Sequence, residues 1–281
     1  MTELRKRMLQ DMKVRGLSPR TQQSYVAAVR RLAKHYRRSP DAVSADEVQA
    51  YLVRLIEVER LSWSTCSIAA HAFRFLYHVT LAHTAAEFVV PLARQPQRLP
   101  EILSVVEVGR LIDAVECPKH RLLMTTIYAC GLRVSEAVQL RVGDIDRYRM
   151  TVRIEQGKGK KDRYVPLSKR LLAALDAYGT THRSEAWIFE GSTPQRPLHI
   201  SSAQKAYGLA KLRARITKRG GLHALRHAFA THLIESGTDV MTVQRLLGHR
   251  QVTTTMRYFH LSRARLAVVR SPLDLLETSR A

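Results

Sequence analysis

The feature of this chain that most limits its fold is a proline-rich stretch between two long segments with helical patterns. Residues 91–100 run Pro-Leu-Ala-Arg-Gln-Pro-Gln-Arg-Leu-Pro. Proline has no amide hydrogen to donate and clashes with the preceding helical turn, so this stretch cannot form the interior of a helix. Its prolines and arginines are typical of an extended basic linker. We therefore predict two domains, over residues 1–93 and 104–281, joined by a linker over residues 94–103.

The first domain has the sequence pattern of packed helices. Ser18 and Pro19 form a typical helix start. The apolar stripe that follows recurs every three or four residues and consists of Tyr25, Val29, Leu32 and Tyr36. Ser44 and Glu47 have the spacing of a capping box, in which the two side chains satisfy free amides at a helix start. A further helical pattern covers residues 63–81.

The second domain has a helical pattern with one interruption. Ser104 and Glu107 form another capping box. Residues 151–155 alternate like a strand, and residues 163–167 are predicted to form a second strand that pairs with them across a lysine-rich turn. Helical patterns resume at Leu171, Ser201 and His223. We therefore expect a mainly α fold of the α+β type, with an N-terminal helical domain and a mostly helical second domain that contains a small antiparallel sheet or hairpin.

The chain carries a large excess of positive charge. It has 46 lysines and arginines against 24 aspartates and glutamates, a formal net charge of +22, and its isoelectric point is about 10.6. Such a charge sets up a field that attracts polyanions, so we expect a nucleic-acid partner. A merely solvated surface or an anionic membrane is the alternative.

Other classes of protein are disfavoured. The sequence has no run of 18 apolar residues that would span a membrane, and its charged start lacks the apolar core of a signal peptide. Cys66, Cys117 and Cys130 are isolated and lack the paired spacing of a zinc site or a disulfide framework. We therefore expect a cytoplasmic, nucleoid-associated protein of bacterial type.

Six side chains suited to phosphate chemistry stand in the second domain. They are Arg133, Lys158, His223, Arg226, His249 and Tyr258. Arginines hold the non-bridging oxygens of a phosphodiester, a tyrosine attacks the phosphorus, and lysine or histidine moves protons. Because a free phenol ionises near pH ~10, the tyrosine needs cationic neighbours and a base. On a chain this basic, the set predicts an enzyme that breaks and rejoins DNA without a cofactor.

Each of these residues also has an ordinary structural interpretation. His223 and His227 have a spacing that could ligate a metal, but Arg226 lies between them and the glutamate of a zinc protease is missing. We therefore expect no metal site. Taken singly, His223 and His249 are more often structural than catalytic, so the prediction depends on the set as a whole.

Two further residues allow two interpretations each. Lys158, between two glycines, is either a solvated hairpin tip or a flexible arm that delivers an ammonium group to a phosphate. Arg133 and Glu136 are three residues apart on a predicted helix. They form either a surface pair worth about 0.5 kcal/mol or an arginine held by a carboxylate while it binds phosphate.

Taken together, these motifs resemble the tyrosine recombinases of the phage integrase family, and the size is similar to the Xer type. The matching segments are Gly16–Tyr25, Gly131–Glu136 around the first arginine, Lys158 of the hairpin, the box His223–His227, Leu247–His249 and Tyr258. The resemblance covers nearly the whole chain, and none of the family's essential positions is substituted.

The resemblance implies a mechanism. Tyr258 attacks the scissile phosphate to form a 3′-phosphotyrosine link, while Arg133 and Arg226 stabilise the developing charge. Lys158 protonates the departing 5′ oxygen, and His223 assists deprotonation of the tyrosine. In the same scheme His249 donates a hydrogen bond to the phosphate, and Glu136 orients the first arginine. Neither a metal nor ATP is needed, because the covalent link conserves the energy of the phosphodiester.

The resemblance also implies an assembly. The domain 1–93 is expected to bind core DNA, and the two domains to clamp double-stranded DNA at paired half-sites. A homotetramer is expected to act through a Holliday junction, with the tail Leu261–Leu276 contacting a neighbouring protomer; docking of that tail on its own domain is the alternative.

Two other functions remain possible from the residues. One is the DNA relaxation of a type IB topoisomerase, and the other is a non-catalytic architectural DNA-binding protein. Within recombination, the residues do not distinguish integration and excision of a mobile element, inversion, or dimer resolution.

Overall fold

Most helix start signals in the sequence correspond to helix starts in the structure. In this computed structural model the chain divides into two compact units, Met1–Gln97 and Arg98–Ala281. The residues described are 2–83, 101–155, 162–182, 184, 186–193, 195–249 and 251–261, without the side chains at 257 and 259–261. Most of the predicted linker, residues 94–100, therefore lies outside the described residues.

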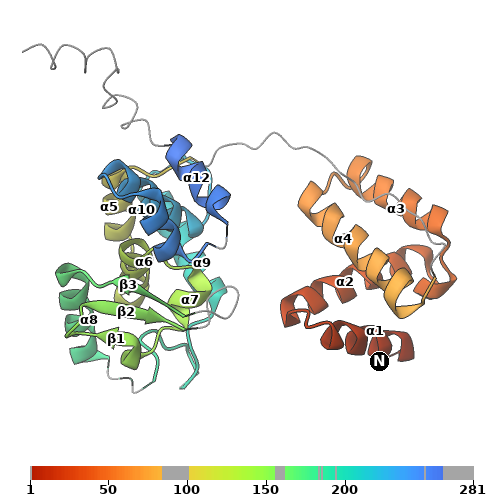
Figure 1. Cartoon of the computed structure of the whole chain (residues 1–281), viewed down its shortest axis with the longest axis horizontal. Helices are drawn as coiled ribbons and strands as arrows, with labels where there is room; N and C mark the ends of the chain where they lie inside the picture. Colours follow the sequence, from red (N-terminus) through yellow and green to blue (C-terminus); the bar gives the residue numbers. More distant parts are fainter. Residues whose placement is uncertain are drawn as a thin grey trace, which may run out of the picture. The chain divides into compact units, whose positions relative to one another are not determined.

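The N-terminal unit is helical (Figure 1). Its elements are α1 (Glu3–Val14), α2 (Pro19–Tyr36), the short 3₁₀ turn η1 (Pro40–Ala42), α3 (Ala45–Glu57), α4 (Trp63–Phe75) and the π-helical turn η2 (Leu76–Thr80). The Ser18 hydroxyl caps α2, and the predicted box of Ser44 and Glu47 forms at the start of α3. The pattern did not indicate α1, which buries only Met8 and Met12 among charged neighbours.

The second unit contains the remaining elements. These are α5 (Val105–Asp113), α6 (Pro118–Cys130), α7 (Val134–Val138), η3 (Val142–Asp144), β1 (Ile145–Asp146), β2 (Thr151–Ile154), β3 (Arg163–Pro166), α8 (Lys169–Thr181), α9 (Ile200–Arg213), α10 (His223–Glu235), α11 (Val240–Leu247) and α12 (Val252–Leu261). The capping box of Ser104 and Glu107 forms at α5. The mainly helical fold class is confirmed.

A three-stranded antiparallel sheet interrupts the helices, with strand order β1-β2-β3. The predicted hairpin pairs Val152 with Val165, and both side chains are buried, whereas Tyr164, the residue before Val165 in β3, is 62% exposed. The strand β1, which the pattern did not indicate, is only two residues long. The period of two along β3 places alternate side chains on the core face.

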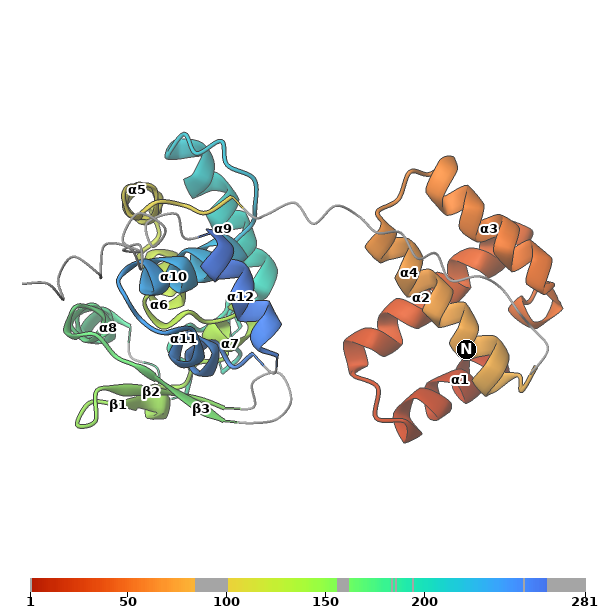
Figure 2. The same ribbon diagram turned by 45° about the horizontal axis from the view of Figure 1, so that its top comes forward.

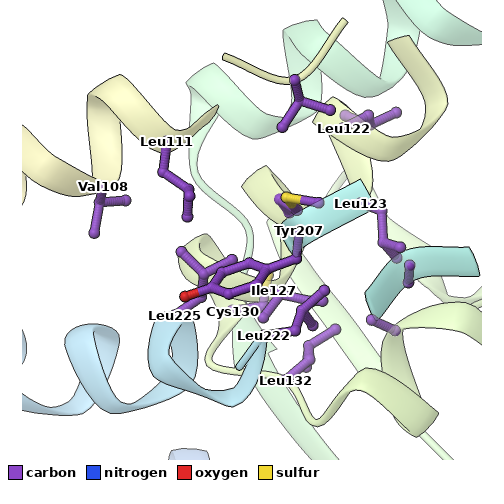
Figure 3. Packing of buried hydrophobic residues seen from close by; sticks show 14 of the residues in the cluster. Val108, Leu111, Leu122, Leu123, Ile127, Cys130, Leu132, Tyr207, Leu222 and Leu225 are labelled. Atoms are coloured by element: carbon purple, nitrogen blue, oxygen red, sulfur yellow. The ribbon is translucent and has the colours of Figure 1, made fainter. Parts of the chain in front are cut away.

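One apolar core joins the sheet to the helices of the second unit. Figure 3 shows Tyr207 of α9 packed among Leu225 of α10, Ile127 of α6 and Leu132. Helix α6 packs against α10, α8 and α9, so it lies at the centre of this unit. No described helix is long and apolar enough to cross a membrane.

Residues 101–103, at the end of the predicted linker, are held against the second unit. The Nζ of Lys218 donates to the carbonyl of Ile102 at 2.8 Å, and Leu103 is buried in the core. These contacts fix the point at which the chain enters α5.

The end of α6 generates the first prediction. Gly131 ends this helix with φ +60°, and a Cβ added there would lie 2.3 Å from the ring of Phe229. Gly131→Ala should therefore lower the free energy of unfolding by about 2–4 kcal/mol, from left-handed strain and overpacking together. Urea unfolding followed by Trp187 fluorescence in a Trp63→Phe background would measure this unit alone.

Gly109 provides the matched control. It lies inside α5, and an added Cβ meets nothing within 4 Å. Gly109→Ala should raise stability by up to ~1 kcal/mol, because alanine favours helix more than glycine does. Equal effects of the two substitutions would contradict the assigned role of Gly131.

Candidate active site

Four elements of the second unit carry the predicted site residues that the structure describes. Arg133 is the N-cap of α7, and Arg226 lies on α10. His249 follows the end of α11, and Tyr258 lies on α12. Helix α12 packs against both α10 and α11, as Figure 2 shows. Residues more than a hundred positions apart therefore meet at one place.

A buried carboxylate, Glu136, lies among the arginines. Its Oε1 accepts a hydrogen bond from Nη1 of Arg133 at 2.6 Å, and its Oε2 accepts one from the Arg133 amide at 2.8 Å. Nη1 of Arg226 lies 3.7 Å from Oε2. The Glu136 side chain is only 7% exposed, so the interpretation of this pair as a surface contact is wrong. A carboxylate held in this way can fix the direction of the Arg133 guanidinium.

The protonation of Glu136 reflects these partners. Burial alone would raise the pKa of Glu136, but hydrogen bonds and positive charge from Arg163 and Arg133 lower it to about 2. The carboxylate is therefore charged over the whole physiological range. A charged group this deeply buried persists only when it is paired.

Arg226 is almost completely buried, with 1% of its surface exposed. Its Nη1 donates to the carbonyl of Gly131 at 2.7 Å and its Nη2 to the carbonyl of Leu247 at 2.6 Å. Burial first, and then the charge of Arg133, lowers the pKa of Arg226 to about 9, so it remains charged at neutral pH. Its Nε has no hydrogen-bond partner in the described part of the chain. A buried donor without a partner is expected where the oxygen of a ligand binds.

Arg163, which our sequence analysis did not select, completes the cluster. It donates to both oxygens of Glu136, at 3.0 and 2.7 Å, and through Nε to the carbonyl of Leu246 at 2.8 Å. It thereby connects β3 to α7 and to the end of α11. The available signal was strand alternation, because Arg163 is two residues from the buried Val165 and so shares its inward face.

His249 uses both of its ring nitrogens. Nε2 lies 3.2 Å from Nη2 of Arg226, and Nδ1 lies 2.9 Å from the hydroxyl of Thr255. Burial, followed by the charge of Arg226, lowers the pKa of His249 to about 4, so the ring is neutral at pH 7. Thr255 is itself fully buried, so its hydrogen bond with Nδ1 helps to fix the orientation of the ring.

Tyr258 is buried, with 4% of its surface exposed, and its hydroxyl forms a 2.8 Å hydrogen bond with Nδ1 of His227. His223 lies beside His227, with ring centroids 4.6 Å apart in an edge-to-face arrangement. Burial is the main cause that lowers the pKa of both histidines, to about 4 for His227. From the sequence, His227 was considered as a metal ligand and as the last residue of the matching box His223–His227, but was given no catalytic role.

Some of the predicted site lies outside the described residues. This holds for Lys158 and for the tail beyond Leu261. Within the described part of the chain, no group of three or more histidine, cysteine, aspartate and glutamate side chains is placed to hold a metal ion.

The cluster around Glu136 generates a stability prediction. Glu136→Gln leaves three guanidinium groups without their shared counter-charge, so the free energy of unfolding should fall by about 3–5 kcal/mol. Because the folded pKa lies below the ordinary value of 4.5, the contribution of Glu136 is complete above pH 4.5 and is lost as the pH falls towards about 2. Unfolding of wild type and variant between pH 2 and 7 would show the difference shrinking in that window.

Glu116 is a suitable control for this prediction. It pairs with Arg213 at 2.9 Å, but its side chain is 76% exposed. Glu116→Gln should change stability by less than ~1 kcal/mol at every pH, as exposed ion pairs do. A pH-independent difference for Glu136→Gln would show that its charge does not stabilise the fold.

The chain is similar to known proteins over both of its units. Residues 101–265 match the phage integrase family, and residues 4–87 match the N-terminal SAM-like domain of phage integrases. An integrase/recombinase of Sinorhizobium fredii is 44% identical over 278 residues, which cover 98% of this chain and 90% of that protein. The tyrosine recombinase XerD of Bifidobacterium longum is 35% identical over 247 residues, 79% of each chain.

Solved structures show the same fold. The Tn1549 transposon integrase aligns with a TM-score of 0.72 at 15% identity, covering 95% of this chain and 99% of that one. The XerA recombinase aligns with a TM-score of 0.54 at 25% identity, covering 99% and 98%. The predicted resemblance is therefore confirmed: the chain belongs to the phage integrase family of tyrosine recombinases.

Proposed function

We propose that this protein is a site-specific DNA recombinase that cuts and rejoins DNA through a 3′-phosphotyrosine intermediate. As a tyrosine recombinase, it is an enzyme of DNA recombination. The observation that best supports the covalent mechanism is that the Tyr258 hydroxyl contacts an imidazole beside Arg226, a buried arginine whose Nε has no partner among the described residues. A nucleophile next to a base, with donors for a phosphate nearby, is what such a reaction requires.

In the proposed reaction two arginines stabilise the negative charge of the phosphate. Arg133 and Arg226 bind the non-bridging oxygens of the scissile phosphate and stabilise the charge that develops as Tyr258 attacks. Both guanidinium groups are held by Glu136, so they need little reorganisation when the DNA binds. His249 adds a hydrogen bond to the phosphate, and His223 assists the deprotonation of Tyr258.

The leaving group requires a proton. Lys158, in the stretch of sequence between β2 and β3, delivers it to the 5′ oxygen as general acid. The covalent bond to tyrosine keeps the energy of the phosphodiester, so rejoining needs neither ATP nor a metal ion. The same chemistry in two rounds exchanges strands through a Holliday junction.

Double-stranded DNA with paired half-sites is the proposed partner. The net charge of +22 supports it, as do the solved relatives XerH, bound to its difH substrate, and the Tn1549 integrase, bound to circular intermediate DNA. We assign core DNA binding to the domain of residues 1–93, where His71, Arg74 and His78 line one exposed hollow. The proposed active species is a homotetramer whose tail, Leu261–Leu276, contacts the next protomer.

A test of this mechanism starts with Tyr258→Phe, which removes only the attacking oxygen. Half-site duplexes are selected with this variant from a random-sequence library and then nicked beside the cleavage point. Wild type should form a denaturant-resistant covalent adduct, in EDTA as well as without it, whereas Tyr258→Phe should bind the duplex but form none. Loss of the wild-type adduct in EDTA would contradict the proposed metal independence.

Tyr148→Phe is the control, because Tyr148 is fully exposed and should leave adduct formation unchanged. An adduct of equal yield from Tyr258→Phe would reject the nucleophile. No adduct from any variant would favour an architectural DNA-binding protein. Relaxation of a plasmid without paired sites by the monomer would favour a topoisomerase.

The general acid can be tested separately. Lys158→Ala should slow cleavage at an ordinary 5′ oxygen by about 10²–10⁴-fold but much less at a 5′-bridging phosphorothiolate, because a thiolate leaves without a proton. Arg133→Ala should slow both substrates, since its role is to stabilise charge. If sulfur rescues the two variants equally, Lys158 is not the general acid, and Lys160→Ala and Lys161→Ala are the next variants to measure.

A further inference from the structure

His227 contacts the attacking oxygen. Its Nδ1 lies 2.8 Å from the Tyr258 hydroxyl, which is within the distance for direct proton transfer. The contact joins α10 to α12, two helices that pack against each other, and Tyr258 lies in a small apolar cluster with Phe229 of α10. The hydroxyl is therefore held towards this imidazole by the fold and not by a flexible surface contact.

The other two histidines of the site are less suited to take the proton. Both nitrogens of His249 are engaged, one with Arg226 and one with Thr255, and its ring lies nearly parallel to the Tyr258 ring at 6.2 Å. His223 contacts His227 through its ring. A role for His223 in deprotonation is therefore indirect, through its effect on the position and charge of its neighbour.

We propose that His227 is the general base that receives the hydroxyl proton of Tyr258 when the tyrosine attacks the scissile phosphate. This inference rests on the proposed function. The O–H bond of Tyr258 breaks and the proton binds Nδ1 of His227, in the tautomer that carries its own proton on Nε2. Meanwhile Oη bonds to phosphorus, the bond from phosphorus to the 5′ oxygen breaks, and that oxygen takes a proton from the general acid. Rejoining reverses each transfer.

The surroundings of His227 link its basicity to DNA binding. Burial first, and then electrostatic interactions with His223 and Arg226 on the same helix, lower its pKa, while α12 presents the Tyr258 hydroxyl to it. In this state the imidazole is neutral and can accept a proton, but it is a weak base. A phosphodiester bound to Arg226 adds a negative charge that offsets the cationic field and strengthens the base. Tyr258 is then activated mainly when its substrate is present.

The inference predicts the behaviour of His227→Asn. The asparagine amide reaches the position of Nδ1 and can accept a hydrogen bond from Tyr258, but it cannot take a proton. Single-turnover adduct formation on the nicked duplex should fall about 10²–10⁴-fold at pH 7. The deficit should shrink as the pH rises from 7 to 9, because hydroxide then replaces the base. Binding of the duplex and the thermal unfolding curve should remain close to wild type.

His223→Asn is the matched variant, one helical turn away. It should lose less activity than His227→Asn and keep the wild-type dependence on pH, since His227 remains in contact with Tyr258. If His227→Asn does not fold, His227→Gln is measured in the same way. Fluorinated tyrosine at position 258, whose phenol ionises at lower pH, should restore more activity to the His227 variant than to His223→Asn.

The outcomes separate this inference from the function on which it rests. Wild-type rates for a folded His227 variant, or a larger and pH-dependent loss in His223→Asn, would reject His227 as the base while leaving the phosphotyrosine mechanism intact. An adduct that forms without Tyr258 would overturn the mechanism itself, and the role of His227 with it.

Discussion

The site of this protein depends on one buried carboxylate. Two arginines that bind one phosphate must lie close together, and their like charges oppose that approach in a buried setting. Glu136 offsets the repulsion by accepting hydrogen bonds from Arg133 and Arg163 while it lies 3.7 Å from Arg226. One carboxylate therefore holds together a short helix, a strand and the helix that carries the second arginine.

Main-chain carbonyls hold the guanidinium of Arg226 in place, whereas the Glu136 carboxylate holds that of Arg133. Its two terminal nitrogens donate to Gly131, at the end of α6, and to Leu247, at the end of α11. Both helices end in a left-handed glycine, and their last carbonyls carry the negative end of the helix dipole. The guanidinium thus has partners that cannot rotate away. This also explains why a residue as polar as arginine lies fully inside the core.

Local chemistry made much of this fold predictable. The serine caps at residues 18, 44 and 104 mark helix starts because they satisfy amides within the same turn, and the hairpin follows from alternation. The pairing of Arg133 with Glu136 was also within reach, because their spacing is short. The missed residues, Arg163 and His227, owe their roles to contacts across 27 and 31 positions of the chain. Strand alternation could place Arg163 on the inward face of β3, but spacing within one element does not name a partner; only the packing of α12 and β3 onto the site reveals these contacts.

In this arrangement charged groups and proton-accepting groups are different residues: the arginines carry positive charge, and the histidines are neutral. Burial lowers the pKa of the three described histidines of the site, to about 4 for His227 and His249, whereas Arg226, with a pKa of about 9, remains charged at neutral pH. Stabilisation of a phosphate by guanidinium groups therefore changes little between pH 5 and 8. The imidazoles of His227 and His249 are neutral and can accept protons over the same range, because burial first, and then neighbouring groups that include Arg226, lower their pKa. In the proposed reaction, proximity of the cations therefore has two effects: it favours binding of an anion, and it keeps the imidazole beside Tyr258 unprotonated before that anion binds.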